Sequence, residues 1–198
     1  MTRPPTRLSN FLQHRGACPE AVFWSRQGSS LEELWLRCPR PEWMLWAMAQ
    51  LGYQGSRRLH RFAARCARRN LVLLADPRSA QAIDVAERHA NAQVGIEELR
   101  RAFRAAQDAA EQAAARPGWT AALACAMTAT ARAARNDALD AAREASSYAA
   151  RAVAWDIHRD ATLESEEAWQ ADELRQIVGN DIDRLIQVAA YESYGHAP

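Results

Sequence analysis

The stretch PEWMLWAMAQLG, residues 41–52, places two tryptophans and two methionines within the six positions from Trp43 to Met48. It begins with a proline and ends with a glycine, which favour the first turn of a helix and the position just beyond its end. On a helical wheel apolar residues cover every side, and Trp43 and Trp46 share one face. Because a helix that is apolar all round usually packs centrally, we expect Trp43 and Trp46 to anchor a core.

The alternative for these tryptophans is a site for a protein partner. Tryptophan and methionine are enriched in protein interfaces, so an exposed edge of the 41–52 cluster would suit one. A membrane is excluded, because the apolar run ends at Gln50 after fewer than ten residues and a spanning helix needs about 20. We therefore expect a soluble protein that makes no contact with a membrane.

The cysteines predict a reducing compartment. There are four of them, and none forms a CxxC pair. Cys66 and Cys125 fall in apolar helical patterns, where a free thiol behaves as a small hydrophobic side chain. The N-terminal residues MTRPPTRLSNFLQ lack the apolar core of a signal peptide. We expect a cytoplasmic protein with no disulfide framework.

Helix start and stop signals recur along the chain, whereas strand signals are almost absent. Prolines at first helical positions, such as Pro19 and Pro41, mark several starts, and glycines mark several ends. The apolar LVLLA segment, residues 71–75, has no partner strand and is expected to be a connector or a helix tail. The candidate N-caps are Ser9, Ser30 (in a capping-box pattern with Glu33), Asp76, Asn136 and Ser165.

Alanine dominates the second half of the chain and makes up over two fifths of residues 101–150. Alanine is the strongest helix former, but it buries little apolar surface per residue. The fold class we expect is all-α, a compact array of seven to nine helices with an alanine-rich C-terminal half. We expect a single domain over 1–198, with a Trp/Arg-rich half (1–93) and an alanine-rich, acidic half (94–198).

The net charge of +1 conceals an asymmetry. Residues 1–104 contain 17 arginines and 9 acidic residues, and residues 105–198 contain 8 arginines and 15 acidic residues, so their net charges are +8 and −7. These opposite charges pair within one chain, pair between chains in a homo-oligomer, or meet different charged partners. All 25 basic residues are arginine, which we interpret as the mark of a GC-rich bacterial or phage coding sequence.

The helix expected over residues 56–70 has one strongly basic side, opposite Leu59 and Phe62. It is interpreted as a solvated or internally paired face, a site for an acidic protein, or a contact for nucleic-acid phosphates. The overall pI of 7.8 and the acidic second half disfavour nucleic acid. The arginines of this ridge are Arg57, Arg61, Arg65 and Arg68, with Arg58 and Arg69 at its border.

Acidic residues concentrate in the C-terminal third of the chain. Acidic residues at helix starts complement the helix dipole, which is a local reason for their presence. They would equally form a surface for a basic partner. These residues are Glu164, Glu166, Glu167, Asp172, Glu173, Asp181 and Asp183.

No motif for catalysis or cofactor binding occurs in the sequence. A Gly-rich phosphate loop, HExxH, GxSxG and an EF-hand loop are all missing. The HRD triplet at 158–160 imitates a kinase catalytic loop, but the chain has no lysine for the accompanying kinase site. Glu87 and His89 are two residues apart and do not share a helix face. We expect no enzyme activity, no cofactor and no metal.

Residues 57–114 resemble a block of alanine-rich, all-helical bacterial proteins identified as immunity proteins of polymorphic toxin systems, the fifth such family. The shared pattern is an Arg-rich helix, a D-x-R turn at Asp76 and Arg78, and an AI-x-x-A-x-R helix that ends at Arg88. His89 stands where the family favours tryptophan. Residues 17–52 and the ELRQIVGN segment (173–180) also resemble segments of uncharacterised bacterial and phage proteins.

The resemblance implies a non-enzymatic protein that occludes a protein partner, either a toxin or another effector. The arginine ridge would steer the encounter, and the tryptophan cluster would form the desolvated anchor. The alternatives are a phage-encoded inhibitor of a bacterial defence complex, a nucleic-acid-binding protein that uses the 57–69 ridge, and an enzyme with an unrecognised site. The candidate partner-binding residues are Arg57, Arg61, Arg65, Arg68, Trp43, Trp46, Asp76 and Arg78.

Overall fold

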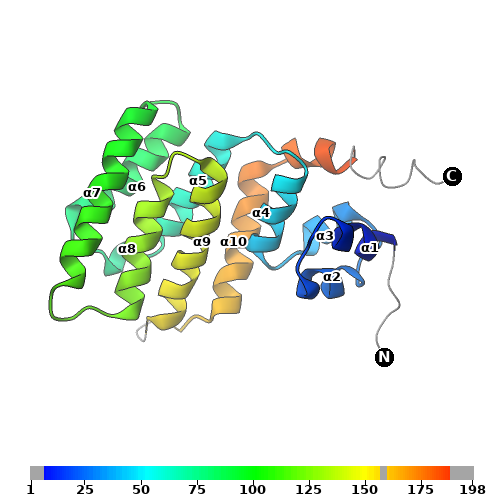
Figure 1. Cartoon of the computed structure of the whole chain (residues 1–198), viewed down its shortest axis with the longest axis horizontal. Coiled ribbons are helices and arrows are strands. Elements are labelled where there is room, and N and C mark those ends of the chain that lie inside the picture. The colour runs from blue at the N-terminus through cyan, green and yellow to red at the C-terminus, as the bar shows by residue number, and fades with distance from the viewer. Residues whose placement is uncertain (1–6, 157–159, 188–198) are drawn as a thin grey trace.

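Helices of the alanine-rich half stand side by side with helices of the Trp/Arg-rich half in two layers (Figure 1). The computed structural model describes residues 7–156 and 160–187. α7, α8 and α9 lie side by side in one layer, α5 and α6 lie against them in the other, α10 is in contact with α5, α9 and α4, and α1 to α3 form a small group beside α4. The helices are α1 (Arg7–His14), α2 (Pro19–Ser25), α3 (Leu31–Arg37), α4 (Pro41–Gln50), α5 (Ser56–Arg68), η1 (Leu71–Leu73), α6 (Pro77–Ala90), α7 (Ile96–Ala114), α8 (Ala121–Ala133), α9 (Ala138–Trp155) and α10 (Leu163–Val178).

The all-α prediction is confirmed, but seven to nine helices is too low a number. Eleven helices lie in the part of the chain described above, and the backbone is helical again over 181–187. Three of them, α1 to α3, lie in the first 40 residues and have only about two turns each. The LVLLA segment forms the short 3₁₀ helix η1, as expected of a connector. None of the described helices is long and apolar enough to cross a membrane.

Helix starts were predicted well where a proline follows the cap. Pro19, Pro41 and Pro77 each occupy the first turn of a helix, and the Asp76 side chain accepts a hydrogen bond from the Arg78 backbone. The Ser30 side chain caps α3 by accepting from the Glu33 backbone. At the end of α4, Gly52 adopts a φ of +67°, a conformation that glycine reaches without steric cost.

Three predicted caps are wrong. Ser9 lies inside α1, and Asp137 rather than Asn136 caps α9. At α10 the cap is Thr162, whose side chain accepts from the Ser165 backbone at 3.2 Å while the Ser165 hydroxyl accepts from the Thr162 backbone at 3.0 Å. Ser165 therefore takes the third helical position of a capping box, because this reciprocal pair satisfies two backbone donors at once.

The core of α4 is formed by methionine and leucine, which corrects the prediction that its tryptophans are the core anchors. Met44, Leu45 and Met48 are at most 1% exposed and belong to the main core cluster, in which α4 packs on α9 and α10. Trp43 and Trp46 are only partly buried. They lie on the side of α4 that turns away from the bundle and towards α1 to α3.

The alanine-rich helices bury their small side chains almost completely. Ala126, Ala129 and Ala133 on α8 are fully buried, as are Ala142 and Ala145 on α9. Because alanine projects only a methyl group, these two helices approach each other closely over their whole length. The contact between α8 and α9 is therefore filled mainly by short side chains at close range.

The charge asymmetry between the two halves is largely satisfied within the chain. Arg58 contacts Asp181 at 2.7 Å, Arg65 contacts Glu173 at 2.9 Å, and Arg69 contacts Glu166 at 2.9 Å. Glu166 is only 1% exposed, so its charge depends on this partner. Each pair joins an arginine of α5, or Arg69 directly after its end, to an acidic residue of the C-terminal third. The internal interpretation of the opposite charges therefore accounts for these residues.

Candidate functional site

An apolar groove lies between the short N-terminal helices and α4, with a cavity volume of about 90 Å³. Its lining is almost entirely carbon. The groove arises because Leu45 and Met48 of α4 face the bundle, whereas the side of α4 that carries Trp43 and Trp46, with part of Met44, faces α1, α2 and α3. The main aromatic and aliphatic lining residues are Phe11, Leu12, Trp24, Trp35, Trp43, Trp46 and Leu51, together with Ile186 from the C-terminal helical turns.

Aromatic rings form the walls of this groove. The Trp24 ring of α2 lies 5.8 Å from the Trp43 ring of α4, centroid to centroid, at an interplanar angle of 48°. Such tilted aromatic pairs are favourable and hold the two helices at a fixed separation. The floor is buried, and burial raises the pKa of the Cys38 thiol above its ordinary value. The groove therefore offers apolar contact rather than a nucleophile or a charge at its base.

The arginines around the groove differ in their partners. Arg40 stacks on the Trp43 ring at 5.1 Å and lies 3.4 Å from the Glu167 carboxylate. Arg175 of α10 donates to the backbone carbonyls of Trp35 and Cys38, and so fastens the end of α3 to the bundle. Arg37 pairs with Glu33 at 2.8 Å.

Arg15 is the exception among these arginines. Its guanidinium stacks over the Phe11 ring at 5.3 Å, and it forms no ion pair with the described residues. Arg15 is also exposed and contributes to the lining of the groove. The positive charge of Arg15 at the edge of this apolar surface therefore has no ion-pair partner within residues 7–156 and 160–187.

The predicted arginine ridge is mostly engaged with other side chains of the chain. Arg61 donates to the Asn91 side chain at 2.8 Å, Arg65 pairs with Glu173, and Arg68 contacts Asp84 and Glu87, both at 2.6 Å. Arg57 is exposed and has no ion pair among the residues described here. The ridge thus connects α5 to α6 and α10, and Arg57 is its least constrained member.

Asp76 and Arg78 form a local structural unit at the start of α6. The Arg78 guanidinium contacts the Asp76 carboxylate at 2.8 Å, and its hydrogen bond holds the pKa of Asp76 below the ordinary value. Arg78 also donates to Gln112 of α7 at 2.8 Å. The D-x-R turn therefore caps α6 and ties it to α7.

The predicted partner-binding residues do not converge on one surface. Trp43 and Trp46 line the groove, the ridge lies on α5, and the Asp76–Arg78 unit lies where α6 meets α7, away from α1 to α3 (Figure 1). Sequence reasoning missed Phe11 and Trp24, which sit on helices of seven or eight residues, and Arg15, which directly follows the end of α1. The signal for the two aromatic residues was that each of the short helices α1, α2 and α3 carries at least one aromatic side chain.

A pair of histidines, His60 and His89, lies in contact within the bundle. The His60 and His89 rings lie 4.9 Å apart in an edge-to-face arrangement. Burial, together with the nearby His89, lowers the pKa of His60 to about 4. His60 is only 2% exposed, so a substrate cannot reach it.

Metal ligands and the HRD triplet add nothing to this site. Among residues 7–156 and 160–187, no three His, Cys, Asp or Glu side chains gather as a metal site requires. His158 and Arg159 of the HRD triplet lie outside the described residues.

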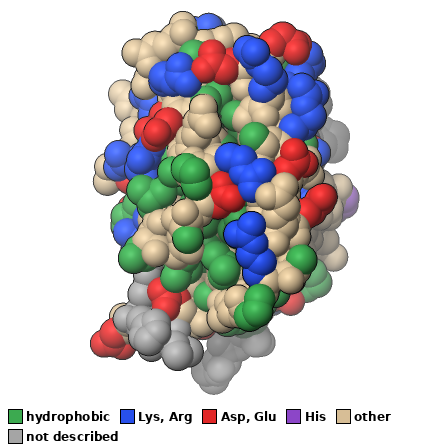
Figure 2. Space-filling model, turned by 90° about the vertical axis from the view of Figure 1, so that its left-hand side faces the viewer, with side chains coloured by type: hydrophobic (Ala, Val, Ile, Leu, Met, Phe, Trp, Pro, Cys, Tyr) green, Lys and Arg blue, Asp and Glu red, His purple; other side chains and the backbone are tan. Residues whose placement is uncertain are grey.

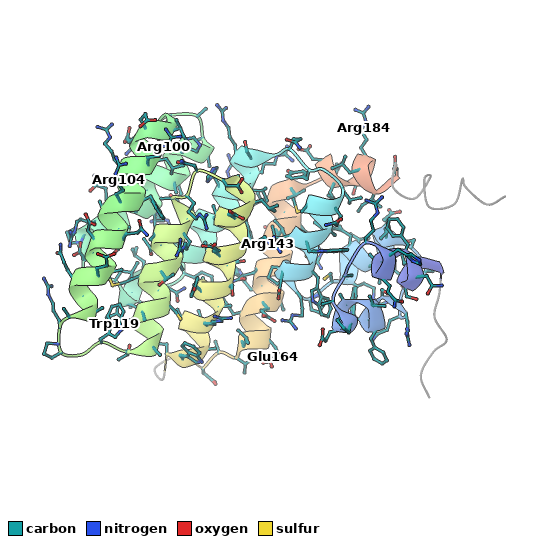
Figure 3. The ribbon with its side chains drawn as sticks, in the orientation of Figure 1. Arg100, Arg104, Trp119, Arg143, Glu164 and Arg184 are labelled. Carbon is teal, nitrogen blue, oxygen red and sulfur yellow. The ribbon has the colours of Figure 1, made fainter. Side chains whose placement is uncertain are left out.

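The described surface at the end of the molecule opposite the groove carries no continuous patch of one charge. Figure 2 shows basic and acidic side chains interspersed over its upper part and hydrophobic side chains over its lower part. Arg100 and Arg104 of α7 lie at this end (Figure 3), and Arg100 pairs with Glu97. A nucleic-acid backbone is instead recognised by a continuous basic surface.

Comparison with known proteins gives no assignment. No protein-family model, no curated protein and no solved structure matches the chain. The resemblance to immunity proteins therefore stays a prediction, and the groove geometry carries the functional argument.

Proposed function

We propose that this protein is a non-enzymatic binding protein that occludes a protein partner, in the manner of an immunity protein or of a phage inhibitor of a defence complex. The observation that carries the proposal is the groove, an open and almost wholly apolar surface walled by Trp24, Trp43 and Trp46. Buried aromatic side chains of this kind supply most of the binding energy in protein interfaces.

The arginine ridge supports a smaller role than the groove. Arg65 and Arg68 already pair with carboxylates of the same chain, so they add little net charge at long range. Arg57 is exposed and remains available to steer an acidic partner. The same pairing weakens the nucleic-acid alternative, because phosphate contacts through Arg65 or Arg68 would first have to replace an internal ion pair.

The test is an affinity capture from lysate of the host, with and without nuclease, using matched variants. Ala47→Arg places a charge in the groove lining, whereas Val72→Arg changes a side chain that is 79% exposed on η1 and lies outside the groove. We expect wild type and Val72→Arg to retain one stoichiometric protein after nuclease, and Ala47→Arg to lose it.

Circular dichroism must show that both variants keep the helical content of the wild type. If Ala47→Arg retains the partner, the groove is not the docking site. If capture depends on intact nucleic acid, the protein-binding proposal itself is wrong.

A further inference from the structure

The size of the groove limits what can fill it. An enclosed apolar cavity of about 150 Å³ takes up benzene, and the cavity of this groove is about 90 Å³. The space is smaller than that cavity but open on one side, so it accommodates one leucine-sized side chain, or a phenyl ring that projects in part through the opening. A long acyl chain would leave most of its carbons in water. The groove therefore fits a single apolar anchor.

The charge at the edge of the groove selects what lies next to that anchor. Arg40 and Arg37 are both within ion-pair distance of carboxylates of the same chain. Arg15 has no such partner among the described residues and is held by its stacking on Phe11. The edge therefore carries a positive charge that has no ion-pair partner among the described residues, and an acidic group would complement it.

The apolar lining strengthens this selection. Electrostatic attraction increases as water is removed, so an acid brought to Arg15 over a carbon surface gains more than it would on an open polar surface. A cation at the same place would be repelled by Arg15 and would find almost no polar group in the lining. Stacking on Phe11 also reduces the conformational freedom that Arg15 loses on binding.

We propose that the groove takes a protein segment that presents one leucine- or phenylalanine-sized side chain with an acidic residue beside it, and that this acid pairs with Arg15. This inference rests on the proposed function and specifies the chemistry of the partner. The apolar side chain supplies affinity, and the acid sets the orientation of the segment.

Small probes with the same anchor and opposite charges test the inference directly. The probes are 4-phenylbutyrate and 4-phenylbutylammonium, titrated into the full-length protein while the indole N–H resonances of Trp24, Trp43 and Trp46 are followed by NMR. We expect the anion to bind at least tenfold more tightly than the cation. Arg15→Gln should remove that preference, and Arg104→Gln, at the opposite end of the molecule (Figure 3), should keep it.

Several outcomes overturn the inference. Equal affinity for the two probes, no binding of either probe, or an unchanged preference in Arg15→Gln would each contradict it. Palmitate that binds in the groove more tightly than 4-phenylbutyrate would assign the groove to a lipid instead.

The partner capture separates this inference from the proposed function. If Ala47→Arg loses the protein partner but Arg15→Glu retains it with wild-type affinity, the docking groove stands and the acidic pairing is wrong. If both variants retain the partner, the groove is not the docking site at all. Equal melting temperatures of wild type and Arg15→Glu show that lost binding is not lost folding.

Discussion

The N-terminal helices and the alanine-rich helices fill space with opposite kinds of side chain. Between α8 and α9, rows of methyl groups such as Ala129 and Ala142 are fully buried, and the two helices are in close contact. Around α1 to α4, large aromatic rings on short helices meet at an angle and leave a groove. Methyl groups leave few gaps between helices that are close together, whereas a few large rings on short helices leave space between them. The two regions therefore differ in how completely they are packed, and the groove that we propose as a docking site lies in the incompletely packed one.

The bundle should be most sensitive where the two halves of the chain meet. Arg69→Met should lower the free energy of unfolding by about 3–5 kcal/mol, because it leaves the buried Glu166 carboxylate without its cation. Urea denaturation followed by circular dichroism measures this.

The matched double variant Arg69→Met with Glu166→Gln should recover part of that loss, since the buried charge is then removed. A double variant as unstable as Arg69→Met alone would show that the ion pair is not what joins the halves.

A larger side chain should lower the free energy of unfolding more in the alanine-packed bundle than in the groove. Ala142→Leu should lower the free energy of unfolding by about 1–3 kcal/mol. The residue is fully buried among close-packed helices, so the larger side chain would force its neighbours out of their preferred positions. Thermal unfolding by calorimetry measures the change. A melting temperature equal to that of the wild type would mean that the bundle contains unrecognised free space, and the contrast with the groove would disappear.

Acid should weaken the bundle through His60. Its folded-state pKa is about 4 and its ordinary value is 6.5, so between these values the unfolded chain binds more protons than the folded chain. Stability is therefore lost as the pH falls from 6.5 towards 4, by about 1.4 kcal/mol per pH unit from this group.

Urea denaturation at several pH values gives this slope, and carboxylates add their own contribution to it. The informative quantity is the difference between wild type and His60→Gln. Identical slopes in the two proteins would show that His60 does not contribute.

The smallest effect on stability should be in the groove. Ala47→Leu adds the same side chain as Ala142→Leu, but to a partly exposed position with free space in front of it. We expect a change within about 0.5 kcal/mol, which is typical of surface positions, together with loss of 4-phenylbutyrate binding. A loss of stability as large as that of Ala142→Leu would show that the groove is closed in solution.

Local signals explain what could be predicted for the fold. The caps at Ser30 and Asp76 and the prolines at Pro19 and Pro41 mark helix starts, because the groups that satisfy the first backbone donors are close in sequence. The prediction failed where two neighbouring residues were both suitable, as with Asn136 and Asp137. There the choice depends on the path of the incoming chain.

The candidate site was predicted only in part. The tryptophan cluster was recognised from composition, and its alternative interpretation as an exposed edge agrees with the position of Trp43 and Trp46 in the groove. Phe11 and Trp24 were not recognised, since nothing in the order of residues states that α1, α2 and α4 face one another. The partners of the arginine ridge were equally invisible, because their spacing is long.

By itself the sequence determined that this chain is helical, that its second half packs through alanine, and that its two halves carry opposite charge, since each follows from composition and short-range periodicity. Tertiary structure alone decided which side of α4 enters the core and that Arg69 meets Glu166 across 97 residues. It also decided that Arg15 stands beside an apolar groove without a counter-charge from the described residues. The physical reason is that helix formation is governed by neighbours along the chain, whereas burial and ion pairing depend on which distant segments share the same space.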